Sequence, residues 1–141
     1  MKDHAVSEVM TKEVVYLPAE TTINEAAQAM RERDIGDVVV TEGPTLAGVV
    51  TDRDIVVRAV AESRDPASTR IGEIASRDLV MIDQQASTGQ AADLMRERGV
   101  RRLLVCDSDR QLVGIVTLGD LAERLDPHSA LGDISRQAPN N

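Results

Sequence analysis

The chain has 141 residues, a formal net charge of −8 and a hydrophobic content of 42%, so it can bury a real core as one domain or two very small ones. The negative charge argues against general nucleic-acid binding, whose affinity comes largely from Lys and Arg at phosphates. Tyr16 is the only aromatic residue, so the aromatic platforms that stack single-stranded bases are missing as well. The N-terminal sequence MKDHAVSEVM is too polar for a signal peptide and no apolar run reaches membrane-spanning length, so we expect a soluble cytoplasmic protein.

The first half of the chain predicts five elements in the order strand, helix, strand, strand, helix. They cover residues 14–17, 21–33, 37–41, 46–51 and 52–62. Thr21 or Thr22 can cap the first helix, because Glu25 stands in its first turn. The two middle strands are separated only by the turn EGP, which indicates a hairpin.

The second half of the chain repeats the first. The sequence AAQAMRER at 26–33 returns as AADLMRER at 91–98, with six of eight residues identical, and GVVTDRDI at 48–55 returns as GIVTLGDL at 114–121. The second set of elements covers residues 79–82, 89–98, 101–106, 111–117 and 118–125. Since one unit of this size leaves a sheet incompletely covered, two copies are expected to bury each other's exposed faces.

The predicted fold is therefore of the α/β (α+β) class, with two β-α-β-β-α repeats packed as a pseudo-two-fold pair. The repeats run over residues 6–62 and 71–125. Residues 63–70, with Pro, Ser and charges, suit an exposed linker, and residues 126–141 form a polar C-terminal tail with at most one short helical turn.

Each repeat brings Thr-x-x-Asp to the junction between its last strand and last helix. Thr51 with Asp54, and Thr117 with Asp120, are first of all capping signals, because the hydroxyl and carboxylate can bind first-turn N–H groups. Two features favour a ligand instead. Gly48 and Gly114 precede the junctions and would allow another group to approach, and a helix N-terminus attracts anions. Together these groups suit a ribose phosphate.

The tandem order of elements and the repeated G-h-h-T-x-x-D-h endings resemble a CBS-domain pair (cystathionine β-synthase domain) over nearly the whole chain. The stretches DIG…TDRDIV and VRRL…LVGIVT are similar to the stand-alone pairs of the mycobacterial hypoxic response protein type. The resemblance implies a disc-like pair that binds adenine nucleotides between its repeats. It assigns the ribose to the motif carboxylates, here Asp54 and Asp120, and the phosphate or ribose to Thr51 and Thr117.

The resemblance also implies a basic residue just before the middle strand of each repeat. Arg102 meets this expectation, and Arg101 must point to the opposite face of its strand. The first repeat has Asp37 there, which would repel a phosphate; Arg53 either compensates or is a solvated surface residue. The expected nucleotide-binding residues are therefore Thr51, Arg53, Asp54, Arg102, Thr117 and Asp120, with the second repeat as the better site.

The leading interpretation is a regulatory, energy-sensing module that binds AMP, ADP, ATP or S-adenosylmethionine in the cleft between repeats and acts on an unknown protein partner. The sequence shows no catalytic constellation and no zinc pattern, so we expect no enzyme activity, no required cofactor and no metal. The alternative is a non-liganded dimer that serves as an interaction or stress-response structural module. The apolar run DIVVRAV at 54–60 predicts a homodimer through the second helix of each repeat.

Overall fold

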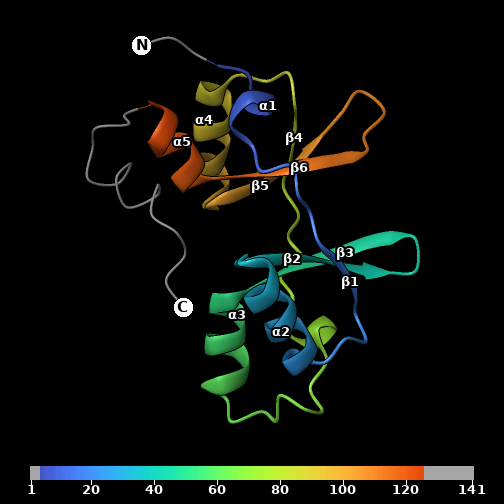
Figure 1. The fold of residues 1–141 in the computed structure, drawn as a ribbon. Coiled ribbons are helices and arrows are strands. Elements are labelled where there is room, and N and C mark those ends of the chain that lie inside the picture. The colour runs from blue at the N-terminus through green and yellow to red at the C-terminus, as the bar shows by residue number, and fades with distance from the viewer. Residues whose placement is uncertain (1–3, 126–141) are drawn as a thin grey trace. The chain divides into compact units, whose positions relative to one another are not determined.

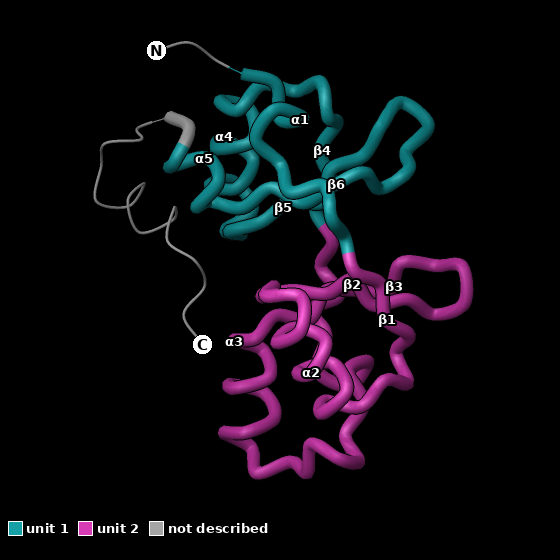
Figure 2. The backbone as a smooth tube through the Cα atoms, viewed as in Figure 1, with its two compact units in different colours: residues 1–14, 80–138 teal, residues 15–79, 139–141 magenta. Residues whose placement is uncertain are grey.

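Two three-stranded sheets form the framework of the chain, and each belongs to its own unit (Figures 1 and 2). The computed structural model describes residues 4–125, so the predicted tail at 126–141 lies outside the described residues. Unit 1 contains residues 4–14 and 80–125, and unit 2 contains residues 15–79. The mixed α+β class predicted from the sequence is confirmed.

Unit 2 is built around the sheet β1-β2-β3. Strand β1 is parallel to β2, and β2 is antiparallel to β3. Its elements are β1 Tyr16–Pro18, α2 Ile23–Arg33, β2 Asp37–Glu42, β3 Thr45–Thr51, α3 Asp52–Ile55, the π-helix η1 Val56–Val60 and the 3₁₀-helix η2 Ile71–Glu73.

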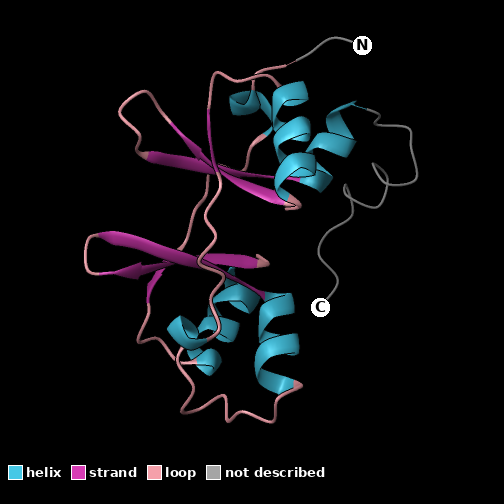
Figure 3. Ribbon diagram, turned by 180° about the vertical axis from the view of Figure 1, so that it is seen from behind, coloured by secondary structure: helices cyan, strands magenta, loops and turns pink. Residues whose placement is uncertain are grey.

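Unit 1 repeats this plan with the sheet β4-β5-β6 and the same parallel and antiparallel pairings. In each unit the helices gather on one side of the sheet (Figure 3). The elements of unit 1 are α1 Val6–Val9, β4 Met81–Asp83, α4 Thr88–Arg98, β5 Arg102–Cys106, β6 Leu112–Thr117 and α5 Leu118–Leu125.

The first long helix of each unit begins at a reciprocal cap. Thr22, not Thr21, is the N-cap of α2: its Oγ1 accepts the Glu25 N–H at 3.2 Å, and Glu25 Oε1 accepts the Thr22 N–H at 3.2 Å. The Thr22 hydroxyl also donates to Glu25 at 2.8 Å, which holds the pKa of Glu25 below its usual value. Ser87 and Gln90 cap α4 in the same way. Both caps place an apolar helix face on the sheet.

The units differ from the sequence repeats because each unit receives its leading segment from the other repeat. Residues 4–14, at the start of the first repeat, belong to unit 1, and residues 71–79, at the start of the second, belong to unit 2. Thr11 pairs with Ile115 of β6 through two backbone hydrogen bonds of 2.8 and 2.9 Å. Ser76 pairs with Val49 of β3 through two bonds of 2.9 Å. We call residues 10–14 and 75–79 the straps.

The straps explain the glycine that precedes each Thr-x-x-Asp junction. A Cβ at Gly48 would lie 2.6 Å from the Ser76 carbonyl oxygen, and one at Gly114 would lie 2.8 Å from the Thr11 carbonyl oxygen. The sequence suggested that these glycines admit another group. The structure shows that the group next to each is the chain's own backbone.

Each sheet has its own apolar core. Val38, Val40 and Val50 of unit 2 pack with Ile23 and Ile71, all at most 2% exposed. The corresponding cluster of unit 1 includes Val6, Ala91, Leu103, Val105, Val116 and Leu121. Because Val6 comes from the first repeat and Ile71 from the second, neither core is complete within one repeat.

Several local expectations change. Helical spacing from Ile23 predicts that Ala26, Ala27 and Met30 share one apolar side of α2; Ala26 and Met30 are buried there, whereas Ala27 is exposed. Most residues of the predicted linker at 63–70 are exposed, but Thr69 is 6% exposed and its carbonyl accepts the Ile23 N–H at 2.9 Å. The buried residues of α2 are Ile23, Ala26 and Met30, so the apolar stripe is narrower than the four-residue spacing of Ala27 from Ile23 suggests.

We expect Gly48→Ala to lower the free energy of unfolding by about 1–3 kcal/mol, because a methyl group would push against strap backbone. Gly36→Ala is the matched control: its Cβ would meet only the carboxylate end of Asp52, at 3.2 Å, and that side chain can move. Urea unfolding of both variants measures the difference. Equal losses at the two positions would contradict the close approach of the strap to β3.

Candidate functional site

Both predicted Thr-x-x-Asp motifs form capping boxes at the strand–helix junctions. In unit 2 the Thr51 N–H donates to Asp54 Oδ2 at 2.9 Å, and the Asp54 N–H donates to Thr51 Oγ1 at 3.0 Å. In unit 1 the Thr117 N–H donates to Asp120 Oδ2 at 2.9 Å, and the Asp120 N–H donates to Thr117 Oγ1 at 3.1 Å. All four residues are half-buried. The structural interpretation of the motif therefore holds at both places.

The capping hydrogen bonds leave the Thr and Asp side chains with further hydrogen-bonding capacity. A carboxylate has about four acceptor positions on two oxygens, and a hydroxyl can donate while it accepts. The cap also fixes both side chains in one conformation, so a ligand would not have to order them. We call Thr51 and Asp54 with the neighbouring Asp37 the first corner, and Thr117 and Asp120 with the neighbouring Arg102 the second corner.

The residue opposite the motif threonine distinguishes the two corners. In the β5–β6 pairing Arg102 stands directly opposite Thr117, and in the β2–β3 pairing Asp37 stands directly opposite Thr51. Arg102 is half-buried, whereas its neighbour Arg101 is exposed. The second corner therefore combines a guanidinium, a hydroxyl and a carboxylate, while the first replaces the guanidinium with a second carboxylate.

More acidic groups surround the first corner. Asp52 follows Thr51 directly, its N–H donates to the Gly36 carbonyl at 2.9 Å, and its Oδ1 accepts the Arg53 N–H at 2.8 Å. The matching residue after Thr117 is Leu118. Arg53 is exposed and is the only cation in the four-residue helix α3. Even when Arg58, described below, is included, two cations against the three carboxylates of Asp37, Asp52 and Asp54 leave this corner negative, which opposes a phosphate.

Arg58 is a residue of the first corner that the sequence analysis did not select. Its Nε lies 3.8 Å from Asp54 Oδ1, and its Nη1 donates to the Ile74 carbonyl oxygen at 3.0 Å. The Asp54 side chain is only 16% exposed. Its Oδ2 accepts the Thr51 N–H, and its Oδ1 faces Arg58. The sequence feature that could have identified Arg58 is its four-residue spacing from Asp54 on one helix, which allows an ion pair.

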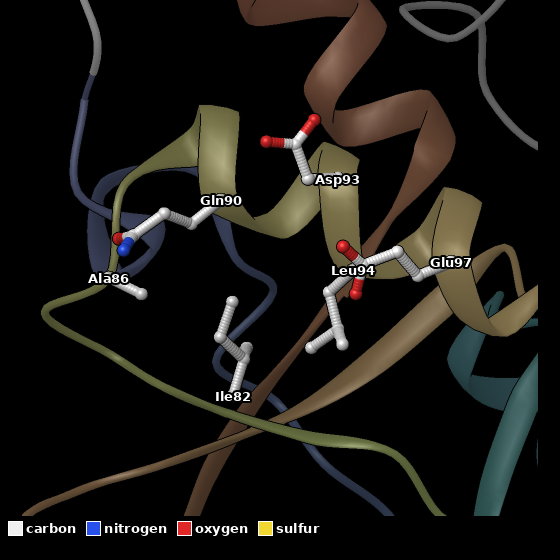
Figure 4. Close-up of a pocket in the computed structure, with 6 residues that line it drawn as sticks. All are labelled: Ile82, Ala86, Gln90, Asp93, Leu94 and Glu97. Atoms are coloured by element: carbon white, nitrogen blue, oxygen red, sulfur yellow. The ribbon is translucent and has the colours of Figure 1, made fainter.

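A shallow pocket in unit 1 lies away from the predicted site. It has a volume of about 310 Å³ and sits between α4 and the segment that follows β4 (Figure 4). Its lining residues are Ile82, Ala86, Gln90, Asp93, Leu94 and Glu97. None of them belongs to either corner, and two carboxylates on its rim make it unsuitable for a phosphate.

Within residues 4–125, no group of three or more His, Cys, Asp or Glu side chains is placed to hold a metal ion. In the same range no helix has the length and apolar character that crossing a bilayer requires.

Comparison with known proteins identifies the family. The model of the CBS domain matches residues 6–60 and again residues 71–127. The chain therefore belongs to the CBS-domain family and carries two CBS domains in tandem, as its repeats and junctions predict.

Relatives of similar length support this assignment. The chain is 39% identical to CBS domain-containing protein YhcV of Bacillus subtilis over 94% of the chain and 96% of that protein. It is 37% identical to Hypoxic response protein 1 of Mycobacterium tuberculosis over 86% and 85% of the two chains. The resemblance to the hypoxic response type is thus confirmed.

Solved structures show the same fold. A crystal structure of Hypoxic Response Protein I with two coordinated zinc ions matches with a TM-score of 0.68 and 35% identity, over 86% of this chain and 98% of that one. A hexameric CBS-CP12 protein from bloom-forming cyanobacteria matches with a TM-score of 0.78 and 26% identity, over 87% and 72%.

We expect Thr117→Ala to lower the free energy of unfolding by about 0.5–2 kcal/mol, because Asp120 loses the acceptor for its N–H. Thr117→Ser keeps a hydroxyl at this position and should stay within about 0.5 kcal/mol of the parent. Denaturant unfolding of the two variants separates loss of the cap from loss of the methyl group. A serine variant as unstable as the alanine variant would contradict the capping role.

Proposed function

We propose that this CBS pair is a regulatory module that binds an adenosine-type ligand at the second corner. AMP, ADP, ATP and S-adenosylmethionine are the candidates, since each carries a ribose diol. Asp120 would accept the ribose hydroxyls, and Thr117 and Arg102 would bind the phosphate of AMP, ADP or ATP. The proposal includes no catalytic step and no required cofactor, and its output would act on a separate protein.

The observation that supports the proposal most is the position of Arg102 directly across from Thr117. A guanidinium can pair with a phosphate through two parallel hydrogen bonds, whereas a carboxylate at that place repels it. The chain is acidic overall, with a net charge of −8, so a half-buried arginine beside a capped helix start is a local exception to the general repulsion of anions.

The first corner favours a second candidate function. Thr51, Asp54 and Arg58 bind one another or the chain's own backbone, and Asp37 and Asp52 make the surroundings negative. There the motif would act only as a helix cap. If both corners behave in this way, the protein is a non-liganded CBS module that works through protein contacts.

Self-association is part of the proposal in either case. The similar CBS-CP12 protein is hexameric, and the structure of this chain leaves apolar side chains exposed on one helix. We propose that this chain also forms oligomers, with the homodimer as the basic unit, and that a ligand changes the surface that the assembly presents to a partner.

The ligand proposal is tested by thermal unfolding with adenosine, AMP, ADP, ATP or S-adenosylmethionine. A ligand present at about 100 times its dissociation constant should add roughly 2.7 kcal/mol to the stability, which raises the midpoint by roughly 5–10 °C. We expect AMP, ADP or ATP to raise the midpoint more than adenosine does, because only they reach Arg102 with a phosphate.

Arg102→Gln should remove most of the difference between AMP and adenosine, and Arg101→Gln, its exposed neighbour, should leave it unchanged. Asp54→Asn should also leave the AMP shift unchanged, because it alters only the first corner. An AMP shift that is lost in Asp54→Asn and kept in Arg102→Gln would place the ligand at the wrong corner. The absence of any shift in the parent protein would favour the non-liganded module.

A further inference from the structure

The pocket beside α4 has a chemistry that neither corner shares. Ile82, Ala86 and Leu94 form its apolar floor (Figure 4). Ile82 belongs to the core of unit 1, and Ala86 and Leu94 pack against that core, so the floor is held in place by the fold. The volume of about 310 Å³ lies at the lower end of the range of about 300–1,000 Å³ that is typical of small-molecule pockets.

The rim of this pocket is polar and acidic. Gln90, Asp93 and Glu97 stand on one side of α4, because they are three and four residues apart. Asp93 Oδ1 lies 3.3 Å from Arg96 Nη2, so part of its charge is already neutralised. Gln90 Oε1 accepts the Ser87 N–H at 2.8 Å as part of the α4 cap. Glu97 makes no ion pair among residues 4–125 and is therefore the strongest acceptor that the rim offers.

A carboxylate above an apolar floor suits a molecule with a cationic head and a short aliphatic body. An anionic ligand would meet Asp93 and Glu97, and the net charge of −8 would repel it further. A quaternary ammonium is normally held by aromatic rings, and Tyr16, the one aromatic residue of the chain, belongs to unit 2. A primary ammonium instead brings three N–H donors, which a carboxylate accepts directly.

The equivalent side of α2 in the first repeat is built differently. The positions 65 residues earlier than Gln90, Asp93, Leu94 and Glu97 hold Glu25, Gln28, Ala29 and Glu32. Glu25 is bound in the cap of α2, and alanine replaces the leucine of the pocket floor. Glu32 is exposed, as Glu97 is. The first repeat thus carries a carboxylate at the same helical position without the leucine beside it, which makes Glu32 a matched control.

We infer that the pocket between α4 and the segment after β4 binds a small primary aliphatic amine in its ammonium form. The ammonium group would pair with Glu97, and the aliphatic chain would lie on Ile82, Ala86 and Leu94. A protein partner would need roughly 800 Å² of contact on each side, whereas the apolar floor consists of three side chains, so we assign the pocket to a free small molecule. The inference does not rest on nucleotide binding at the second corner.

The inference is tested by NMR titration of the isotope-labelled full chain at neutral pH. Pentylammonium carries a charge and an aliphatic chain, methylammonium carries the charge with almost no chain, and pentanol carries the chain alone. We expect pentylammonium to shift the signals of Ile82, Ala86 and Leu94 along a saturating curve, with a dissociation constant of about 1–10 mM. Methylammonium and pentanol should each bind at least about 5-fold more weakly.

Three variants at exposed positions assign the charge. Glu97→Gln keeps the size of the side chain and removes its charge, so it should weaken pentylammonium binding about 5-fold and leave pentanol binding unchanged. Glu32→Gln removes the same charge from the equivalent position of α2 and should change neither. Arg96→Gln releases Asp93 from its ion pair and should strengthen pentylammonium binding about 2-fold.

Three results would overturn the inference. The first is a response to pentylammonium that does not saturate or that methylammonium reproduces, which would indicate general attraction of cations to an acidic chain. The second is an equal loss of binding in Glu97→Gln and Glu32→Gln. The third is a capped lysine amide that binds more than about 10-fold more tightly than pentylammonium, which would assign the pocket to a lysine of another protein.

The same titration keeps this inference separate from the proposed nucleotide site. Pentylammonium should leave the signals of Thr117 and Asp120 unchanged, whereas AMP should shift them. A failure of AMP to shift these signals would count against the ligand at the second corner and would leave the amine pocket standing. Pentylammonium shifts that centre on Thr117 and Asp120 would overturn the amine pocket instead.

Discussion

The rest of the structure depends on the backbone pairing of the two straps. The strap at the start of the first repeat pairs antiparallel with β6 of the second repeat, and the strap at the start of the second repeat pairs antiparallel with β3 of the first. Two backbone hydrogen bonds of 2.8–2.9 Å hold each strap in place. A residue with a side chain at Gly48 or Gly114 would collide with that backbone. The pairing thus requires glycine three residues before each motif threonine, and it delivers Val6 and Ile71 to cores that their own repeats do not contain.

The corners show how one local sequence can serve two purposes. Thr-x-x-Asp makes the same capping box in both repeats, with bonds that differ by at most 0.1 Å. What differs is the residue supplied by the neighbouring strand, which is Asp37 in one case and Arg102 in the other. The cap is a requirement of folding, and it holds a carboxylate and a hydroxyl in place at no further conformational cost. A substitution on the adjacent strand can then decide whether the corner favours an anionic or a cationic ligand.

Much of the fold follows from the sequence because the chain repeats itself and its hairpins and caps have strong local signals. The boundaries are less predictable. The sequence predicts the first strand at 14–17, whereas the structure has it at Tyr16–Pro18, the three residues that pair with β2. The helix at 52–62 has helical spacing, but the spacing does not reveal that its second half is a π-helix. The strap exchange depends on contacts between distant residues, for which the only local signal was the pair of glycines.

The residues of the candidate site could be predicted from the sequence, but most of the contacts between them could not. The internal repeat and the resemblance to CBS domains predicted the residues of both corners. The contrast between Asp37 and Arg102 was also visible in the sequence. The sequence could not show that Arg58 faces Asp54 and also binds the Ile74 carbonyl, because that second contact joins residues 16 positions apart across the unit.

The exchange of leading segments has a consequence for how such a chain can arise. A protein with a single repeat could complete its core in the same way only by trading this segment with another molecule, so it would exist as a segment-swapped pair whose assembly depends on concentration. Joining two copies in one chain makes the trade intramolecular and replaces the concentration of partners with the much higher effective concentration set by a short connection. The tandem duplication can therefore be understood as the covalent fusion of a swapped dimer.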